Sequence, residues 1–316
     1  MSKLPLATVV IPAYNVSKYI GECLESLLSQ SYRDMEILVV DDGSTDGTAD
    51  IVRRYANADS RITLFCNDNH GVSYSRNYAI ERGAGDYLLF VDADDVVSSD
   101  FVEALVRPLS DGMCEMSAVG IAAFFGGAPA FSTGVGHIYN NDEKYRACLD
   151  VCSGFAWNKG FLYYIIRDNN IRFDQSIAQS EDMLFLLDYL GHCSSIAFDD
   201  GVKYGYRQRR ESAANYQRSI KWFDAIKVYE AYENRLGANA ELRDVVRRVF
   251  LPIAYEAVWR YRNCGIENEA LRERISSMRS SCERALPACP LPFRLKMYAY
   301  RHFMGAEMFR RRLVTR

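Results

Sequence analysis

The nine residues ATVVIPAYN, at positions 7–15, are the stretch of this sequence that indicates its fold most clearly. The run 7–11 is rich in β-branched residues and lacks polar alternation, which is typical of a strand buried on both faces of a sheet. It ends in the turn Pro12, Ala13, Tyr14 and Asn15, and apolar residues then recur at helical spacing over 17–29. A buried strand that leads directly into a helix predicts a parallel α/β sheet.

The same alternation continues outward along the chain. Further buried strands are expected over 36–40, 62–65 and 87–91, and helices around 51–55 and over 72–80. Parallel strands joined by short links need right-handed crossovers, so these segments predict a doubly wound, mostly parallel α/β sheet flanked by helices. An apolar run over 116–125 predicts one more strand.

The pattern changes in the last third of the chain. From about residue 221 onward, charged residues and aromatic stripes recur at helical spacing. We therefore expect a domain over 1–215, with halves at 1–110 and 111–215, and a helical C-terminal region over 216–316.

Composition argues against several classes of protein. The formal net charge of −3 is against a nucleic-acid binder, and no stretch approaches the ~20 apolar residues of a membrane span. The nine cysteines are scattered without a Cys-x-x-Cys pair, which predicts reduced thiols in a cytoplasmic protein rather than disulfides or a zinc site. Metal chemistry in this chain is therefore expected to use oxygen ligands.

Acidic residues gather where the predicted strands end. Open α/β sheets bind ligands at the carboxyl ends of their strands, and Asp92 and Asp94 directly follow the strand 87–91. Two carboxylates one residue apart can face one hard cation, such as Mg²⁺ or Mn²⁺, whose oxygen shell is completed by phosphate oxygens. The alternative is a solvated turn whose aspartates cap the next helix. Acids at a second strand end, Asp41 and Asp42, favour the metal.

Two common nucleotide-binding loops are missing from the sequence. A dinucleotide-binding fold needs Gly-x-Gly-x-x-Gly after the first strand, where residues 12–15 stand instead, and the Walker lysine loop is also absent. Asp42 could accept a hydrogen bond from a nucleobase or a ribose, or it could serve only in a turn and helix cap. A nucleotide would therefore be bound by acids and a metal rather than by a glycine cradle.

Four groups of residues resemble inverting glycosyltransferases of family 2, which have the GT-A fold. They are residues 11–15, 39–46, 71–73 with 76–77, and 92–95. The likeness extends through 157–159, 172–174, 181–182 and 206–209, and covers about residues 5–215. Tyr74 replaces the small residue often found in the third group, and the Gln-x-x-Arg-Trp signature of processive polysaccharide synthases is missing.

The resemblance implies that the half 1–110 binds a nucleotide-sugar donor. Asp42 would read the nucleobase, usually uracil, and the loop Pro12, Ala13, Tyr14 and Asn15 would pack along it. The other implied donor contacts are Arg76, Asp92, Ala93 and Arg207, with Mn²⁺ or Mg²⁺ held by Asp94 and Asp92.

The resemblance places acceptor binding and catalysis in the half 111–215. Asp182 of the Glu181-Asp182 pair would be the general base, which takes the acceptor's hydroxyl proton opposite the leaving diphosphate and so inverts the anomeric centre. A helix N-cap is the alternative interpretation of this pair. Trp157 and Asn158 are expected at the acceptor, although a buried core tryptophan explains Trp157 equally well.

The expected reaction is transfer of one sugar from a UDP-sugar to a saccharide or lipid-linked saccharide, as in bacterial surface polysaccharide assembly. Two alternatives remain open. A non-catalytic nucleotide-sugar-binding module would have no need of a base such as Asp182. A sugar nucleotidyltransferase would favour a glycine-rich, basic loop after the first strand, and residues 11–16 contain neither glycine nor lysine.

The C-terminus is strongly basic. Residues 294–316 carry seven Lys or Arg and one acid, a local charge of +6, so the remainder carries −3 − 6 = −9. One interpretation is purely structural: a terminal helix that packs on the domain. The other interpretation is peripheral contact with an anionic membrane, which would place the protein at the inner face of the cell membrane. Each basic residue would contribute roughly 1 kcal/mol to the binding free energy.

Overall fold

The computed structural model describes residues 5–150, 152, 154–209, 223–236, 240–263, 265, 267–289, 291, 294 and 297–298. They form two compact units. One comprises Met1–Lys144, Cys152–Ser176 and Glu181–Arg210, and the other Tyr145–Val151, Ile177–Ser180 and Glu211–Arg316. The predicted boundary near residue 215 and most of the basic segment 294–316 lie outside the described residues.

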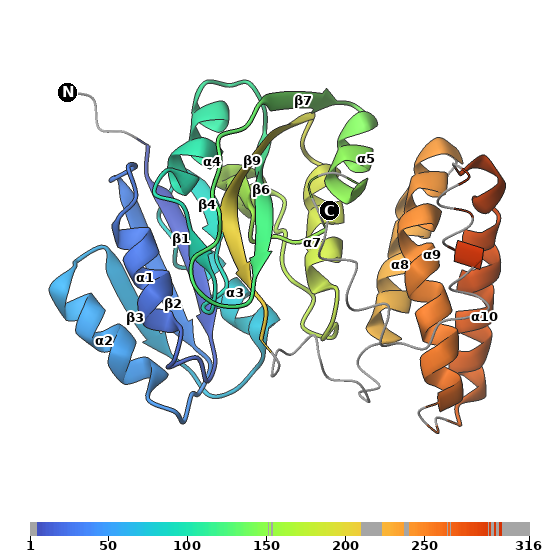
Figure 1. Cartoon of the computed structure of the whole chain (residues 1–316), viewed down its shortest axis with the longest axis horizontal. Coiled ribbons are helices and arrows are strands. Elements are labelled where there is room, and N and C mark those ends of the chain that lie inside the picture. Colours follow the sequence, from blue (N-terminus) through green and yellow to red (C-terminus); the bar gives the residue numbers. More distant parts are fainter. Residues whose placement is uncertain are drawn as a thin grey trace. The chain divides into compact units, whose positions relative to one another are not determined.

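The first unit begins with alternating strands and helices (Figure 1). The strands are β1 (Ala7–Ala13), β2 (Met35–Asp41), β3 (Ile62–Cys66) and β4 (Tyr87–Phe90), and the helices are α1 (Ile20–Leu28), α2 (Thr48–Ala58) and α3 (Val72–Ile80). The strands pair in parallel in the order β3-β2-β1-β4. Every residue of β1 except Pro12 is buried, as expected for a central strand covered on both faces.

The second half of this unit adds strands of both directions. They are β5 (Val96–Val97), β6 (Met116–Phe124), β7 (Gly136–Asn140), β8 (Lys159–Leu162) and β9 (Ser195–Arg207). The sheet continues as β4-β8-β6-β9-β5, with β7 paired to β9; β6 and β9 run parallel, and β8 is antiparallel to both of its neighbours. The accompanying helices are α4 (Phe101–Ser110), α6 (Tyr163–Asp168) and α7 (Glu181–Leu190), whereas most of α5 (Glu143–Asp150) belongs to the second unit.

The predicted doubly wound α/β fold is confirmed, and β1 to β4 and α3 agree with the prediction to within two residues, whereas α1 begins three residues later than expected and α2 extends three residues further at each end. The sequence did not predict β7, β8 and β9 as strands. Four of the five residues of β7 are exposed, so it lacks the alternation that signals a half-buried strand. The β6–β9 ladder is interrupted at Gly120, where the register shifts, and this obscures the period of β9.

An aromatic cluster fills the core beneath the strand ends. The Phe173 and Phe185 rings stack with centroids 4.2 Å apart, and Phe90 meets both rings edge-on. Each of these side chains is almost fully buried. Such packing fixes β4 and α7 relative to each other, and both elements lead into the candidate site.

The second unit is helical, as expected for the C-terminal region. Its elements are α8 (Asp224–Arg235), α9 (Ala240–Asn263), α10 (Glu269–Glu283) and the short 3₁₀ helix η3 (Leu286–Ala288). Tyr229 and Tyr232 on α8 pack against Phe250 on α9. Arg274 on α10 pairs with Glu230 on α8 at 2.6 Å, so ion pairs as well as apolar contacts join the helices.

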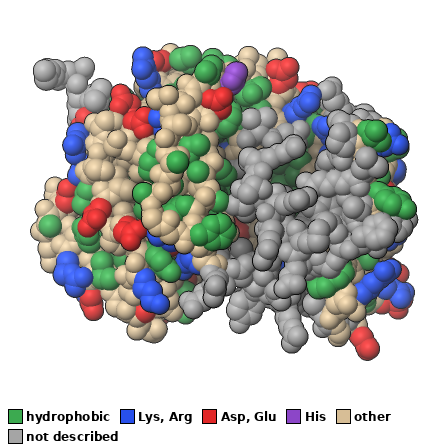
Figure 2. Space-filling view, viewed as in Figure 1, with side chains coloured by type: hydrophobic (Ala, Val, Ile, Leu, Met, Phe, Trp, Pro, Cys, Tyr) green, Lys and Arg blue, Asp and Glu red, His purple; other side chains and the backbone are tan. Residues whose placement is uncertain are grey.

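The surface of the described part of the chain is of mixed charge. Figure 2 shows acidic and basic side chains interspersed on the face that it draws. None of the helices in the described residues combines the length and the apolar character needed to span a lipid bilayer.

Candidate functional site

The loop after β1 is tied to the loop after β2. Asn15 adopts a φ of 50°, its amide donates to Ser44 Oγ at 2.9 Å, and its side-chain oxygen accepts from the Thr45 amide at 2.9 Å. Tyr14 is left 49% exposed on the outer side of this loop. The structure therefore presents residues 12–15 at the carboxyl ends of the parallel strands, where the sequence predicted a donor contact.

Asp42 organises the loop that precedes α3. Its two carboxylate oxygens accept hydrogen bonds from the amides of His70 and Gly71, at 2.9 and 2.7 Å. Gly71 has a φ of 95°, a conformation that favours glycine, and this explains the residue at that position. A carboxylate oxygen can accept a second bond, so Asp42 keeps acceptor capacity for a ligand.

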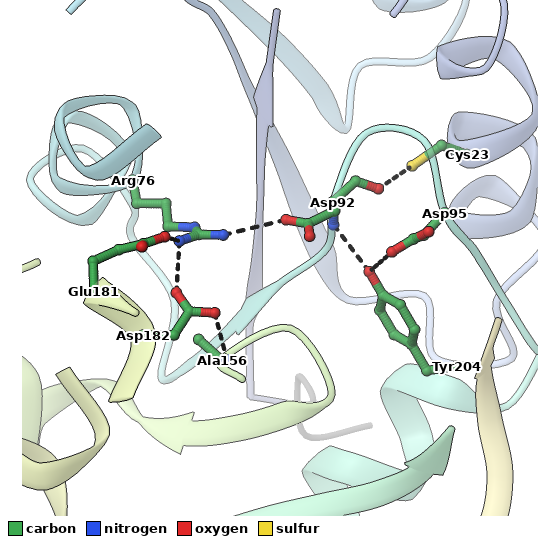
Figure 3. A network of polar contacts seen from close by, with 8 residues as sticks. All are labelled: Cys23, Arg76, Asp92, Asp95, Ala156, Glu181, Asp182 and Tyr204. Carbon is green, nitrogen blue, oxygen red and sulfur yellow. Dashed lines mark hydrogen bonds and ion pairs between the residues drawn. The ribbon is translucent and has the colours of Figure 1, made fainter. Parts of the chain in front are cut away.

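Arg76 on α3 joins the two halves of the candidate site (Figure 3). Its guanidinium donates to Asp92 at 3.2 Å, to Glu181 at 2.9 Å and to Asp182 at 2.6 Å. Only 4% of the Arg76 side chain is exposed, and it lies over the Phe173 ring with its carbon 5.0 Å from the centroid. One buried cation thus brings the acid after β4 and the acidic pair of α7 together.

Glu181 and Asp182 lie in the first turn of α7 rather than at a cap position before it. Acidic residues are common in the first turn of a helix, where the helix dipole is positive. The second oxygen of Asp182 accepts from the Ala156 amide at 3.1 Å, so Arg76 and a loop amide fix the orientation of this carboxylate. The preceding residue, Ser180, has a φ of 70°, a conformation that costs energy in a residue other than glycine.

Asp94 faces a different pair of arginines. Its carboxylate pairs with Arg209 at 2.6 Å, and its carbonyl accepts from Arg207 Nε at 2.8 Å. Arg207 also donates to Glu22 on α1 at 2.5 Å. Ala93, between the two acids, is buried, so the exposed part of this turn is mainly carboxylate.

Asp95 and Tyr204 form a link that the sequence analysis missed. Asp95 is fully buried, and its oxygens accept from Tyr204 Oη at 2.8 Å and from the Arg207 amide at 2.7 Å. Tyr204 Oη in turn accepts from the Asp92 amide at 3.0 Å. Because buried carboxylates are hydrogen-bonded, a buried Asp95 requires hydrogen-bond donors. That requirement was the only signal in the sequence that could have pointed to the Tyr204 hydroxyl on another strand.

The acids perturb one another. Burial, with the charges of Asp92 and Asp94, raises the pKa of Asp95 to about 9. Burial also raises the pKa of Asp92 to about 7, against the lowering effect of Arg76, and it raises the pKa of Glu181 beside Asp182. Burial opposes the charge of Arg76, but the three acids outweigh it and raise the pKa of the guanidinium. Burial is the largest cause of each of these carboxyl shifts, so the ionised forms of these acids are costly unless a cation faces them.

Trp157 and Asn158, which the sequence analysis expected at the acceptor, are both buried in the structure. Trp157 is 3% exposed, and its indole stacks with the rings of Phe155, Tyr204 and Tyr206 at centroid distances of 5.0, 4.3 and 5.5 Å. Asn158 is 1% exposed and donates to the Val119 carbonyl at 2.7 Å. A buried indole cannot offer a face to a sugar in this conformation.

The carboxylates of the 92–95 turn suit a metal ion that also binds oxygen atoms of a substrate. No group of three or more His, Cys, Asp or Glu that could hold a metal occurs among the described residues. Asp92 and Asp94 supply two carboxylates, and burial raises the pKa of both. Mg²⁺ is commonly bound by one or two carboxylates plus phosphate oxygens, so this pair fits such an ion once a diphosphate is present.

Comparison with known proteins agrees with this architecture. The sequence profile of Glycosyl transferase family 2 matches residues 8–164. Glycosyltransferase GlyG of Streptococcus pneumoniae is 36% identical over 245 residues, which cover 71% of this chain and 78% of GlyG. The chain belongs to glycosyl transferase family 2. Glycosyltransferase GlyA of the same organism is 29% identical over 238 residues, 69% of this chain but only 33% of GlyA.

Solved structures show the family fold. Staphylococcus aureus TarS 1–349 in complex with UDP-GlcNAc has a TM-score of 0.68 at 20% identity and covers 93% of this chain and 87% of that one. The mannosyltransferase PcManGT of Pyrobaculum calidifontis, in complex with GDP-Man and Mn²⁺, has a TM-score of 0.55 at 18% identity, over 94% of this chain and 80% of PcManGT. At these identities the likeness concerns the fold.

Proposed function

We propose that this family-2 glycosyltransferase is an inverting, metal-dependent enzyme that moves a single sugar from a UDP-sugar to a saccharide or lipid-linked saccharide. The observation that carries the proposal is the position of Arg76, which bonds to both Asp92 and Asp182. An acid suited to the donor and a carboxylate suited to the acceptor thus lie on either side of one guanidinium. Transfer needs both groups at one reacting carbon.

The donor would bind at the carboxyl ends of β1, β2 and β4. Asp42 and residues 12–15 would contact the base, and Asp92, with Ala93 and Arg207, the ribose and diphosphate. The UDP and UDP-GlcNAc complexes of TarS, a protein with the same fold, support a uridine donor. Arg207, 11% exposed and fixed by Asp94 and Glu22, is suited to planar phosphate recognition.

Asp94 and Asp92 would hold Mn²⁺ or Mg²⁺ together with the diphosphate. The ion would supply Lewis-acid stabilisation of the charge that the leaving diphosphate acquires. The Mn²⁺ in the PcManGT complex supports this assignment at the level of the fold. The pKa of Asp94, which burial raises, supports it from this chain's own residues, because a cation beside this carboxylate would favour its ionised form.

Asp182 would act as the general base. Its carboxylate is held by Arg76 and the Ala156 amide, so little reorientation is needed when an acceptor hydroxyl arrives. The acceptor oxygen, as it loses its proton to Asp182, would form a bond to the anomeric carbon on the face opposite the diphosphate while the bond to the leaving diphosphate oxygen breaks, and this inverts the centre. Glu181 shares Arg76 and is the alternative base.

The wider setting rests on the relatives. Their names include a putative teichuronic acid biosynthesis glycosyltransferase of Bacillus subtilis, 38% identical over 117 residues, which supports bacterial surface polysaccharide assembly. We propose a catalytic domain over 1–215, in a protein of the cytoplasm that contacts the inner face of the membrane through its basic C-terminus. The Arg76 network favours a catalyst over a binding-only module, and the family favours sugar transfer over nucleotidyl transfer.

A donor screen tests the proposal. The rate of nucleoside diphosphate release is measured with a panel of UDP-, GDP- and dTDP-sugars, with and without saccharide acceptors. A UDP-sugar should be turned over, and calorimetry should detect UDP binding. Tight UDP binding without turnover of any donor would support the binding module, and release of pyrophosphate from UTP and a sugar phosphate would support the nucleotidyltransferase.

A further inference from the structure

A column of aromatic rings ends on the surface beside the candidate base. Phe155 is 47% exposed, and its ring stacks on Trp157 at a centroid distance of 5.0 Å and an interplanar angle of 14°. Trp157 stacks in turn on Tyr206 at an angle of 11°. Because the indole covers one face of the Phe155 ring, the exposed part of Phe155 is the opposite face with its edge.

A buried lysine, Lys159, holds the loop that carries Phe155. Lys159 is fully buried, and its ammonium donates to the carbonyls of Phe155 and Cys152 at 2.7 and 2.8 Å. It also donates to Asn158 Oδ1 at 2.8 Å. Burial of a lysine is costly, and here the cation is used to hold loop carbonyls. An exposed phenylalanine on a loop fixed in this way is pre-organised to bind a ligand.

The position of the loop connects this ring to the reaction. Ala156, the next residue, donates its amide to Asp182 Oδ2 at 3.1 Å. Consecutive Cα atoms are about 3.8 Å apart, so Phe155 starts one residue from the contact with the candidate base. The loop that carries the exposed ring therefore contacts the candidate base through its backbone.

We propose that Phe155 is the platform on which the acceptor sugar binds, with the C–H face of a pyranose stacked on the free side of the ring. Aromatic rings provide a large apolar surface at low conformational cost, and a pyranose offers a matching apolar face while its hydroxyls point outward. This assignment rests on the proposed function, and it names the acceptor as a pyranose whose stacked face is free of charged groups. Trp157 then supports the platform instead of forming it.

The test compares Phe155→Ala and Phe155→Tyr with the wild-type protein. Tyr164→Ala is the matched control, because Tyr164 is also a surface aromatic, 54% exposed, but follows β8 at the edge where β4 begins. Binding of methyl β-glucopyranoside, methyl β-galactopyranoside and methyl N-acetyl-β-glucosaminide is followed by saturation-transfer NMR in the presence of UDP. UDP affinity and the rate of donor hydrolysis in water are measured on the same samples.

Phe155→Ala should weaken pyranoside binding roughly 2- to 12-fold, the range expected for loss of one stacked ring. Phe155→Tyr should restore it, and Tyr164→Ala should leave it unchanged. UDP affinity and donor hydrolysis should be the same in all four proteins. Equal pyranoside binding by wild type and Phe155→Ala, or none by wild type, would overturn the platform while leaving the donor site intact. Loss of UDP binding in the wild type would instead refute the proposed function.

Discussion

Replacing Arg76 by methionine tests whether one buried guanidinium holds the acids of the site together. The residue is 3% exposed, and its N–H groups bond to Asp92, Glu181 and Asp182. Methionine is flexible and of similar length, so Arg76→Met removes the charge with little loss of packing volume. The change therefore isolates the electrostatic contribution of Arg76.

The size of the effect follows from burial. Removing one partner of a buried ion pair costs about 3–5 kcal/mol, because an uncompensated charge is left behind. The Asp92 side chain is 29% exposed and its share is screened by water, whereas Glu181 and Asp182 are 12% and 9% exposed. We therefore expect the free energy of unfolding to fall by about 3–5 kcal/mol at pH 7.5 in metal-free protein.

The deficit should shrink as the pH falls. Without the guanidinium, the pKa values of Asp92 and Glu181, which burial already raises, rise further above their unfolded values, so folding takes up protons. Stability then increases as the pH falls from the folded pKa toward the unfolded value of about 4. Each extra bound proton changes the free energy by about 1.4 kcal/mol per pH unit, so the step from pH 7.5 to pH 5.5 should recover about 1–3 kcal/mol of the deficit.

Urea denaturation followed by circular dichroism, in EDTA at both pH values, measures this effect. Arg82→Met is the control: Arg82 lies just beyond α3 and stacks on Tyr78, but its side chain is 38% exposed. It should lose less than about 1 kcal/mol. An Arg76→Met deficit no larger than that of the control, or one that does not change with pH, would refute the account of Arg76 as the counter-charge of the site.

Three further outcomes are expected. EDTA should abolish sugar transfer and Mn²⁺ or Mg²⁺ should restore it, whereas Asp94→Ala should stay inactive with either ion; full activity in EDTA would contradict the metal proposal. Asp182→Asn should lower kcat by ~10² or more with UDP affinity nearly unchanged in calorimetry, and a near-normal kcat would move the base to Glu181. Tyr204→Phe should raise the Mn²⁺ concentration needed to promote UDP binding in calorimetry, and Tyr163→Phe, which also removes a buried hydroxyl, should not; equal effects would make Tyr204 merely structural.

The position of the acids at the strand ends could be predicted from the sequence. Buried strands without alternation, each followed by a helix, leave few choices of topology, and the carboxyl ends of the strands must then share an edge. Asp42 and Asp92 lie at strand ends for this reason. The sequence did not reveal which of these carboxylates would accept hydrogen bonds from other groups of the protein. Asp42 accepts two loop amides, and backbone donors carry no signature in the side-chain pattern.

The contacts from the second half of the first unit were harder to predict. Asp95 and Tyr204 are 109 residues apart, and they meet only because β9 pairs with β5, a strand of two residues. The sequence motif around Trp157 suggested a sugar platform, but it could not show that Tyr204 and Phe155 cover the indole. Long-range pairing decides which ring of a local aromatic motif remains exposed.

The arginines at and beyond the end of β9 supply counter-charge to the acids of the 92–95 turn. Arg209 pairs with Asp94, and its guanidinium carbon lies 5.2 Å from the centroid of the Tyr19 ring. A cation bound to Asp94 would compete with this ion pair, and a diphosphate would attract the released guanidinium. The metal would neutralise the Asp94 carboxylate, and the diphosphate would neutralise the Arg209 guanidinium that the metal displaces. Donor and metal would therefore bind together at lower electrostatic cost than either alone. The same exchange would leave Arg76 with Asp182, since both side chains are buried and pair at 2.6 Å. In this account the base side of the site stays fixed while the donor side changes partners.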